Sequence, residues 1–205
     1  MYGIIFLEVA MIIEFPYDRE RAVEYAKRWA LSRNPLFFDF TGRGGNCTNF
    51  VSQCLFAGSG VMDFTPTFGW YFRSSSDRAP AWTSVESLFD FLTDSGDFAG
   101  MDKQGPFAVP VADESQIELG DVVQLANSSG DFYHTLIISG FTDSDILVCA
   151  QSDNALDRPL STYPYASLRI LHIVGVALKL PLDDSFLPLI EGSDLRSVTA
   201  VDTEV

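Results

Sequence analysis

The sequence predicts an α+β protein in which helices precede an antiparallel sheet. In the first half of the 205-residue chain, apolar side chains recur every three or four positions, as on one face of a helix. From residue 121 onwards the pattern changes to short apolar runs bounded by turn residues, which is typical of strands. Because helical and extended segments do not alternate along the chain, we expect the sheet to be antiparallel.

Composition indicates one packed domain and argues against several classes of protein. The formal net charge of −15 argues against nucleic acid as a partner, since phosphate binding needs a basic surface. Three cysteines are an odd count, which argues against a disulfide framework. Together with two histidines, and without Cys-x-x-Cys or His-x-x-His spacing, they also argue against structural zinc. No other metal or cofactor is implied either, because the thiol chemistry considered below needs none.

The two ends differ from the middle of the chain. Residues 1–15 form an apolar extension, but Met1–Ile13 has no basic start, is interrupted by Glu8 and is too short to span a bilayer. We expect no membrane insertion and find no convincing signal peptide, so the sequence does not decide between the cytoplasm and export by another route. Residues 181–205 are acidic and predict a solvated tail. The domain is expected to occupy residues 16–180.

Two helices can be placed from their capping residues. Asp18 is expected to cap a helix that runs to Asn34, where Asn-Pro stops it. Thr83 and Glu86 form a capping-box pattern that begins a helix running to about Thr93.

The second half predicts a hairpin and a final strand. Residues 94–116 are turn-rich and predict little regular structure. Strands are expected at residues 121–125, 134–141, 146–152 and 168–178. The turn Thr142–Asp145 joins the second and third of these, and folding the chain there sets His134 opposite about Gln151, or opposite Ser152 if the register is shifted by one residue.

The stretch Gly42–Leu55 carries the strongest chemical signal. A glycine-rich turn is followed by Asn46, a favourable N-cap, and by Cys47 at the start of an apolar helix that glycines end. Unpaired N–H groups and the helix dipole favour the nucleophilic thiolate there, and the N–H groups of Cys47 and Thr48 could hold an oxyanion. The alternative is that Cys47 is an ordinary buried thiol, as we expect for Cys54.

A cysteine nucleophile needs a base and a group that orients the base. His134 begins a strand beside a loop, whereas His172 lies inside an apolar run, so we favour His134. Candidates for the orienting group are Gln151, Asp153 and Asn154. Gln151 is best placed by the hairpin, and Asp153 is the better chemical choice because a carboxylate stabilises an imidazolium.

An aromatic cluster lies in the irregular segment 62–80. Trp70 and Tyr71 either line a substrate cleft, together with Asn46, or simply cover the core.

Several of these motifs resemble the bacterial putative amidase domain family over roughly residues 16–178. They are Tyr17-Asp18-Arg19, Asn46–Leu55, Gly120–Val123, the strand of His134 and Leu156–Leu160. The resemblance implies a branch of the papain-like superfamily, which includes NlpC-type and CHAP cell-wall peptidases. Their fold packs a nucleophile helix on an antiparallel sheet, and their Cys-His-polar triad hydrolyses amides, often in peptidoglycan stem peptides. By this resemblance Cys47 is the nucleophile and His134 the base.

Two positions depart from the family pattern. The family usually has aspartate where this chain has Asn46, and histidine where this chain has Gln151. From the resemblance, and from Cys47 and His134, we expect a cysteine amidase or peptidase that forms an acyl-enzyme on a peptide or peptidoglycan-like amide. The alternatives are a non-catalytic wall-peptide-binding module with a degenerate triad, or acyl transfer by the same triad. Nothing in the sequence indicates an oligomeric state.

Overall fold

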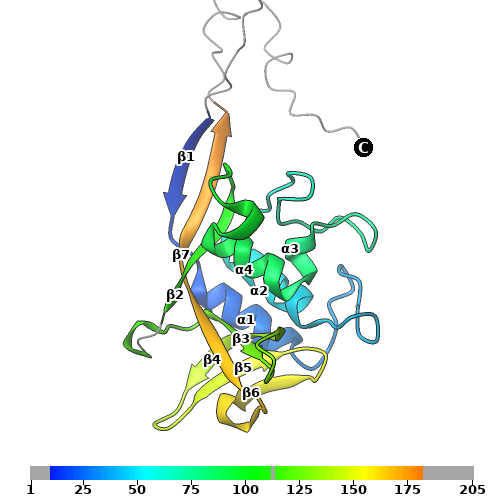
Figure 1. Cartoon of the computed structure of the whole chain (residues 1–205), viewed down its shortest axis with the longest axis vertical. Helices are drawn as coiled ribbons and strands as arrows, with labels where there is room; N and C mark the ends of the chain where they lie inside the picture. The colour runs from blue at the N-terminus through cyan, green and yellow to red at the C-terminus, as the bar shows by residue number, and fades with distance from the viewer. Residues whose placement is uncertain (1–9, 112–113, 182–205) are drawn as a thin grey trace, which may run out of the picture. The chain divides into compact units, whose positions relative to one another are not determined.

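The computed structural model describes residues 10–111 and 114–181 (Figure 1). The chain divides into two compact units, of which one is Glu14–Leu178 and the other combines the two ends of the chain. The larger unit contains every residue that the sequence analysis singles out for chemistry. The expected segments 1–15 and 181–205 fall mostly outside the described residues, apart from a strand that begins at Ala10 and the last residue of a strand that ends at Pro181.

The elements confirm the predicted α+β class. The helices are α1 (Arg19–Trp29), α2 (Cys47–Ser59), α3 (Pro80–Thr83) and α4 (Val85–Thr93), with short 3-10 turns at Gly96–Phe98, Glu114–Gln116 and Leu160–Thr162. The strands are β1 (Ala10–Phe15), β2 (Gly105–Val111), β3 (Val122–Ala126), β4 (Phe132–Phe141), β5 (Ile146–Ala150), β6 (Ala155–Pro159) and β7 (Ser167–Pro181). Their order is β1-β7-β3-β4-β5-β6, with β2 also paired to β7. The pairs β2–β7, β3–β4, β3–β7, β4–β5 and β5–β6 are all antiparallel.

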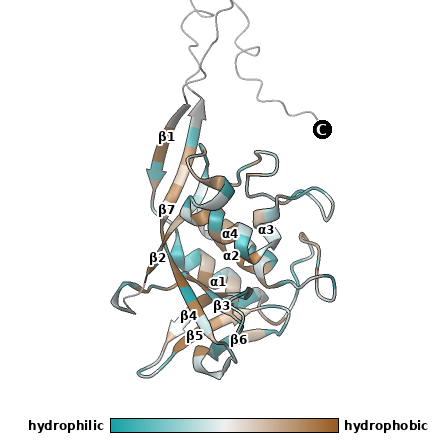
Figure 2. Cartoon of the chain, viewed as in Figure 1, coloured by the Kyte–Doolittle hydropathy of each residue, from teal (hydrophilic) through white to brown (hydrophobic). Residues whose placement is uncertain are grey.

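Helices cover one face of this sheet, and alternate side chains of the strands face opposite ways. Val122, Ile137 and Cys149 pack against the helices, whereas their neighbours Val123, Leu136 and Val148 belong to a second cluster on the other face. The second cluster is closed by residues of the 3-10 turn Leu160–Thr162 and its flank. Figure 2 shows hydrophobic residues along β4 and β5, whose side chains are mostly buried on both faces.

Two helix boundaries differ from the prediction. Asp18 caps α1 as expected, but the helix ends at Trp29 instead of Asn34. The chain turns there, because the N–H of Ser32 bonds back to the carbonyl of Trp29. The cap of α4 is Ser84 and not the neighbouring Thr83, since the Ser84 hydroxyl accepts the N–H of Ser87.

Two strands were not predicted. Strand β2 lies in a segment for which we expected little regular structure, and β6 follows the predicted hairpin. Pro106 and Pro110 lie within β2 and pair with Val176 and Leu171 of β7. Among the described strands, β2 pairs with β7 alone, so the other edge of β2 needs no N–H donors and proline is tolerated there.

The predicted hairpin is present, but its register is wrong. The N–H of Thr142 bonds to the carbonyl of Asp145 across the turn, as expected. A bulge between Ile138 and Gly140 then shifts the pairing, so that Ile137 lies opposite Cys149. The described pairing of β4 with β5 ends there, and His134 pairs with Leu125 of β3 instead of Gln151.

Trp70 lies in the core and does not line a cleft. Its side chain has no exposed surface, stacks near Trp82 at a ring-centroid distance of 4.8 Å, and donates its indole N–H to Ser52. Of the two alternatives for Trp70, the one in which it covers the core is therefore correct, and the one in which it contacts substrate is wrong. Tyr71 is half-buried and packs beside Phe64.

Candidate active site

Cys47 lies at the N-terminus of α2, where the sequence predicts it. The preceding turn needs glycine, because Gly42, Gly44 and Gly45 have φ values of 77°, 100° and 101°. The first helical hydrogen bond runs from the N–H of Phe50 to the carbonyl of Asn46. Within the described residues, the N–H groups of Cys47 and Thr48 have no hydrogen-bond acceptor, which is the arrangement an oxyanion needs.

Asn46 is at the N-cap position, but its side chain does not cap the helix. Its oxygen accepts the N–H of Phe40 and the side-chain amide of Asn49, and its amide group donates to the oxygen of Gln151. The residue is only 1% exposed. All of its side-chain polar atoms are therefore occupied by the protein, which contradicts the expectation that Asn46 contacts substrate.

A threonine pair connects the start of α2 to the start of β4. The hydroxyls of Thr48 and Thr135 lie 3.0 Å apart and share a hydrogen bond in the core. Cys47 and His134 are the residues that directly precede these two threonines. The bond therefore brings the two backbone segments that carry the thiol and the imidazole together.

His134 lies among aromatic rings at the entrance of β4. The residue is 9% exposed, and its ring stacks beside Tyr133 at 6.2 Å and lies 5.9 Å from the ring of Tyr163. Burial lowers the pKa of His134, the negative charge of Asp153 raises it, and the positive charge of Arg158 lowers it further. The net effect favours the neutral imidazole, the form that can accept a proton from a thiol.

The three candidates for the orienting group have different surroundings. Gln151 is 1% exposed and donates its amide to the carbonyls of Trp29 and Ser32, both at 2.8 Å. With its oxygen bonded to Asn46, no side-chain polar atom of Gln151 is directed to His134. These bonds join the end of α1 to the start of α2, and the described residues show no hydrogen bond between Gln151 and His134.

Asn154 is also committed elsewhere, because its side-chain oxygen accepts a hydrogen bond of 2.9 Å from Arg33. Asp153 is exposed. Two charged side chains act on the pKa of His134, and Asp153 is the carboxylate of the two. Of the three candidates, Asp153 is the one that carries a charge, and this charge raises the pKa of His134.

Ser152 was expected only as the residue opposite His134 in a register shifted by one, and its contact with Asn46 was not predicted. Its hydroxyl accepts the N–H of Asn46 at 2.7 Å, and its own φ of 84° is left-handed. A serine in this conformation is uncommon, and such strain concentrates where a structure must hold a particular geometry. The tight turn after β5 thus fixes the backbone immediately before Cys47, and no pattern in the sequence signals it.

His172 belongs to a different cluster. Its Nδ1 lies 2.9 Å from a carboxylate oxygen of Asp121, which is fully buried and also accepts from Arg19 at 2.7 Å. Arg19 follows Asp18, whose N–H donates to the carbonyl of Gly58 near the C-terminus of α2. This places the cluster at the end of the 13-residue helix away from Cys47, on the order of 20 Å along its axis.

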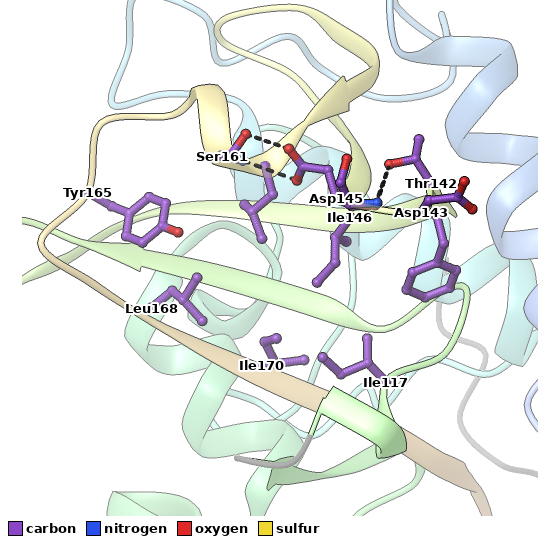
Figure 3. Close-up of a pocket in the computed structure, with 12 residues that line it drawn as sticks. Ile117, Thr142, Asp143, Asp145, Ile146, Ser161, Tyr165, Leu168 and Ile170 are labelled. Carbon is purple, nitrogen blue, oxygen red and sulfur yellow. Dashed lines mark hydrogen bonds between the residues drawn. The ribbon is translucent and has the colours of Figure 1, made fainter.

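A groove of about 460 Å³ lies elsewhere on the unit (Figure 3). It lies around the turn between β4 and β5, and Ile117, Leu168 and Ile170 form part of its apolar lining. Asp145 at its rim accepts the hydroxyl of Ser161. His134 is at the other end of β4, so this groove is separate from the candidate active site.

Residues 10–111 and 114–181 contain no group of three or more His, Cys, Asp or Glu side chains placed to hold a metal ion. Nor does any helix in that part of the chain have the length and apolar character needed to cross a membrane.

Comparison with known proteins places these observations in a family context. The family model of the putative amidase domain matches residues 16–174. The chain is similar to the uncharacterized protein YhbB of Bacillus subtilis (strain 168), with 37% identity over 127 residues, covering 60% of this chain and 37% of that protein. It is also similar to the uncharacterized protein YjcM of the same organism, with 27% identity over 152 residues, covering 70% of this chain and 32% of that protein. The chain thus spans about a third of the length of these relatives, and no solved structure matches it.

Proposed function

The chain belongs to the putative amidase domain family, and from this premise we propose that it is a cysteine-dependent amidase or peptidase with a papain-like, NlpC-type arrangement of its active site. The family assignment itself indicates an amidase. The cysteine mechanism, the papain-like relationship and the substrate are our proposals.

The observation that carries the proposal is the junction between α2 and β4. A thiol at a helix N-terminus and an imidazole at the start of a strand are the two groups that acyl transfer needs. The Thr48–Thr135 hydrogen bond joins the two elements one residue away from each group. Burial raises the pKa of the Cys54 and Cys149 thiols, which makes them poor nucleophiles.

The reaction follows from these positions. His134 takes the thiol proton of Cys47, and the sulfur attacks the carbonyl carbon of the amide to form a tetrahedral intermediate. The N–H groups of Cys47 and Thr48 hold its oxyanion. The C–N bond then breaks, the amine leaves with the proton from His134, and a thioester remains. Water, deprotonated by His134, attacks the thioester and releases the acid and the free thiol.

Asp153 is our choice for the group that supports the base. A carboxylate beside an imidazolium stabilises the charged form that appears during the reaction. Its charge raises the pKa of His134 against the effect of burial, which supports this role. Asp153 is exposed, so we expect its contribution to be smaller than that of a buried triad carboxylate.

A peptide amide, such as one in a peptidoglycan stem peptide, is the substrate class we propose. This rests on the family resemblance of the sequence. Since the curated relatives are about three times as long as the matched region, the activity and partners of any longer protein are proposals too.

Alkylation of the cysteines tests the mechanism without knowledge of the substrate. The intact protein is treated briefly with iodoacetamide at mildly acidic to neutral pH, and adducts are counted by mass. We expect one adduct that forms faster than on a small free thiol, is absent in Cys47→Ser and forms more slowly in His134→Ala. Cys54→Ser is the matched control and should leave the rate unchanged.

Activity is then measured on stem-peptide fragments. Free acid and amine as products support hydrolysis, whereas an amine-ligated product supports acyl transfer. Tight binding without cleavage, combined with a Cys47 that reacts like a free thiol, would support the binding module instead. Full amide hydrolysis by Cys47→Ala would contradict the cysteine mechanism.

A further inference from the structure

We propose that the substrate of this site carries a carboxylate within a few bonds of the scissile carbonyl, and that Arg158 and the hydroxyl of Tyr163 bind that carboxylate. This inference rests on the proposed function, because it assumes that Cys47 and His134 are the reacting pair. It adds the chemical class of the substrate.

Arg158 lies next to the candidate base without an acidic partner. Its guanidinium carbon lies 3.9 Å from the centre of the Tyr163 ring, and that ring lies 5.9 Å from the ring of His134. Nε and one terminal nitrogen donate to the hydroxyl and carbonyl of Thr162, which holds the side chain in place. No carboxylate of the described residues lies within ion-pair distance of Arg158.

What distinguishes Arg158 from other arginines is its position beside the candidate base. Arg28, Arg43 and Arg78 also stack on aromatic rings without an ion pair among the described residues, whereas Arg19, Arg33 and Arg169 are each paired. Arg158 is half-buried and stacked on a tyrosine, with one terminal nitrogen that makes no hydrogen bond among the described residues. A guanidinium fixed in this way is well suited to a carboxylate ligand.

Tyr163 is the second, independent observation. The residue is 8% exposed, and its hydroxyl is buried without a hydrogen-bond partner among the described residues. Burial raises the pKa of Tyr163, so the phenol keeps its proton and is a donor at neutral pH. A buried, unpaired hydroxyl costs stability, and such groups are retained where they serve a ligand or a reaction.

The two donors therefore flank the base, and a bound carboxylate there would lie beside the reacting bond. Asp153 is the acidic group that acts on both His134 and Tyr163. Its negative charge opposes a substrate carboxylate, so binding requires the direct contacts of Arg158 and Tyr163 and not a general positive field. The preference should accordingly depend on these two residues and little on remote charges.

A pair of alkylating agents tests this directly. Iodoacetate and iodoacetamide both displace iodide with the Cys47 sulfur, but only iodoacetate carries a carboxylate. The measured quantity is the ratio of their rate constants on Cys47 at neutral pH and 0.15 M salt. We expect Arg158→Gln to lower this ratio about tenfold, as for the loss of a charge-assisted hydrogen bond. Arg158 also lowers the pKa of His134, but a resulting change in the reactivity of the thiol affects both reagents alike and cancels in the ratio.

Arg21→Gln is the matched control. It removes the same charge from an arginine that is paired with Asp18 near the far end of α2. We expect no change in its ratio, since the Debye length in this salt is about 8 Å. An equal ratio in wild type and Arg158→Gln, or an equal fall in Arg21→Gln, would overturn the inference.

Tyr163→Phe separates a ligand role from a structural one. Because the hydroxyl has no partner, its removal should leave the melting temperature unchanged or slightly raised, yet lower the ratio about threefold. A lower melting temperature with an unchanged ratio would show that the hydroxyl is structural and would remove Tyr163 from the inference.

The two proposals fail in distinguishable ways. If Cys47 reacts with iodoacetamide no faster than a free thiol, the proposed function fails, but the rate ratio still measures the carboxylate preference. If Cys47 does not react at all, the imidazole NMR signals of His134 are followed during titration with N-acetylglycine and with N-acetylglycinamide. A shift with the acid alone, abolished by Arg158→Gln, supports the carboxylate site, and identical responses to both compounds overturn it.

Discussion

Replacing Gln151 with alanine measures the role that this residue has in the structure. Its amide donates to two carbonyls at the end of α1, and its oxygen accepts from Asn46 at the start of α2. Each such hydrogen bond contributes about 1 kcal/mol net, and all three are lost together at a site that is 1% exposed. We expect Gln151→Ala to lower the free energy of unfolding by about 3 kcal/mol.

Urea unfolding of the full chain, followed by circular dichroism, gives this free energy. A loss of this size in a domain of 150–250 residues corresponds to a fall of roughly 10 °C in the melting temperature. Asn154→Ala is the matched control from the same turn, and we expect it to cost less than about 1 kcal/mol, because Asn154 is exposed and makes one bond to Arg33. The reasoning is refuted if Gln151→Ala costs no more than the control but slows Cys47 alkylation, because Gln151 would then act on the base.

Three further predictions follow from buried groups. Asp121→Asn should cost about 3 kcal/mol or more in urea unfolding, because it leaves the Arg19 guanidinium without its buried carboxylate, and a cost below 1 kcal/mol would contradict this. Trp70→Phe should cost about 2 kcal/mol through the lost bond to Ser52 and the smaller ring, yet leave the alkylation rate of Cys47 unchanged, whereas a stable variant with slow alkylation would return Trp70 to the site. Burial lowers the pKa of His134 below 6.5, so the unfolded chain binds more protons than the folded one just below pH 6.5, and stability should rise with pH through that window. His134→Gln should flatten this rise when unfolding is compared between about pH 5 and pH 6.5, and an unchanged slope would show that another group is responsible.

Features with a local cause could be predicted from the sequence. The capping carboxylate of Asp18 and the glycines before Cys47 act within a few residues, and both elements begin where expected. The turn Thr142–Asp145 is likewise set by its own residues. The helix that carries the candidate nucleophile therefore follows from the sequence nearly to its last residue, Ser59.

Features that depend on residues far away in the sequence could not be predicted. Whether Trp70 faces a cleft or the core depends on Ser52 and on other rings that reach it only in the folded state. The strand register around His134 depends on a bulge that the residue types do not predict. Strand β2 forms by pairing with β7, which lies far from it in the chain. Arg158 and Tyr163 could not be predicted as site residues for the same reason. Their proposed role depends on their closeness to His134 in the fold and not on their spacing in the chain.

The two residues that depart from the family pattern are hydrogen-bonded to each other. Where the family resemblance leads us to expect aspartate and histidine, this chain has Asn46 and Gln151, and these two side chains bond each other in the core. An aspartate and a histidine facing one another would form a buried charged pair, whereas two amides form a neutral one, so the paired change keeps the contact without the cost of burying charge. The absence of a histidine at position 151 is then a matter of how α1, α2 and the turn after β5 are held together. Asp153 is then the residue that we propose to support the base.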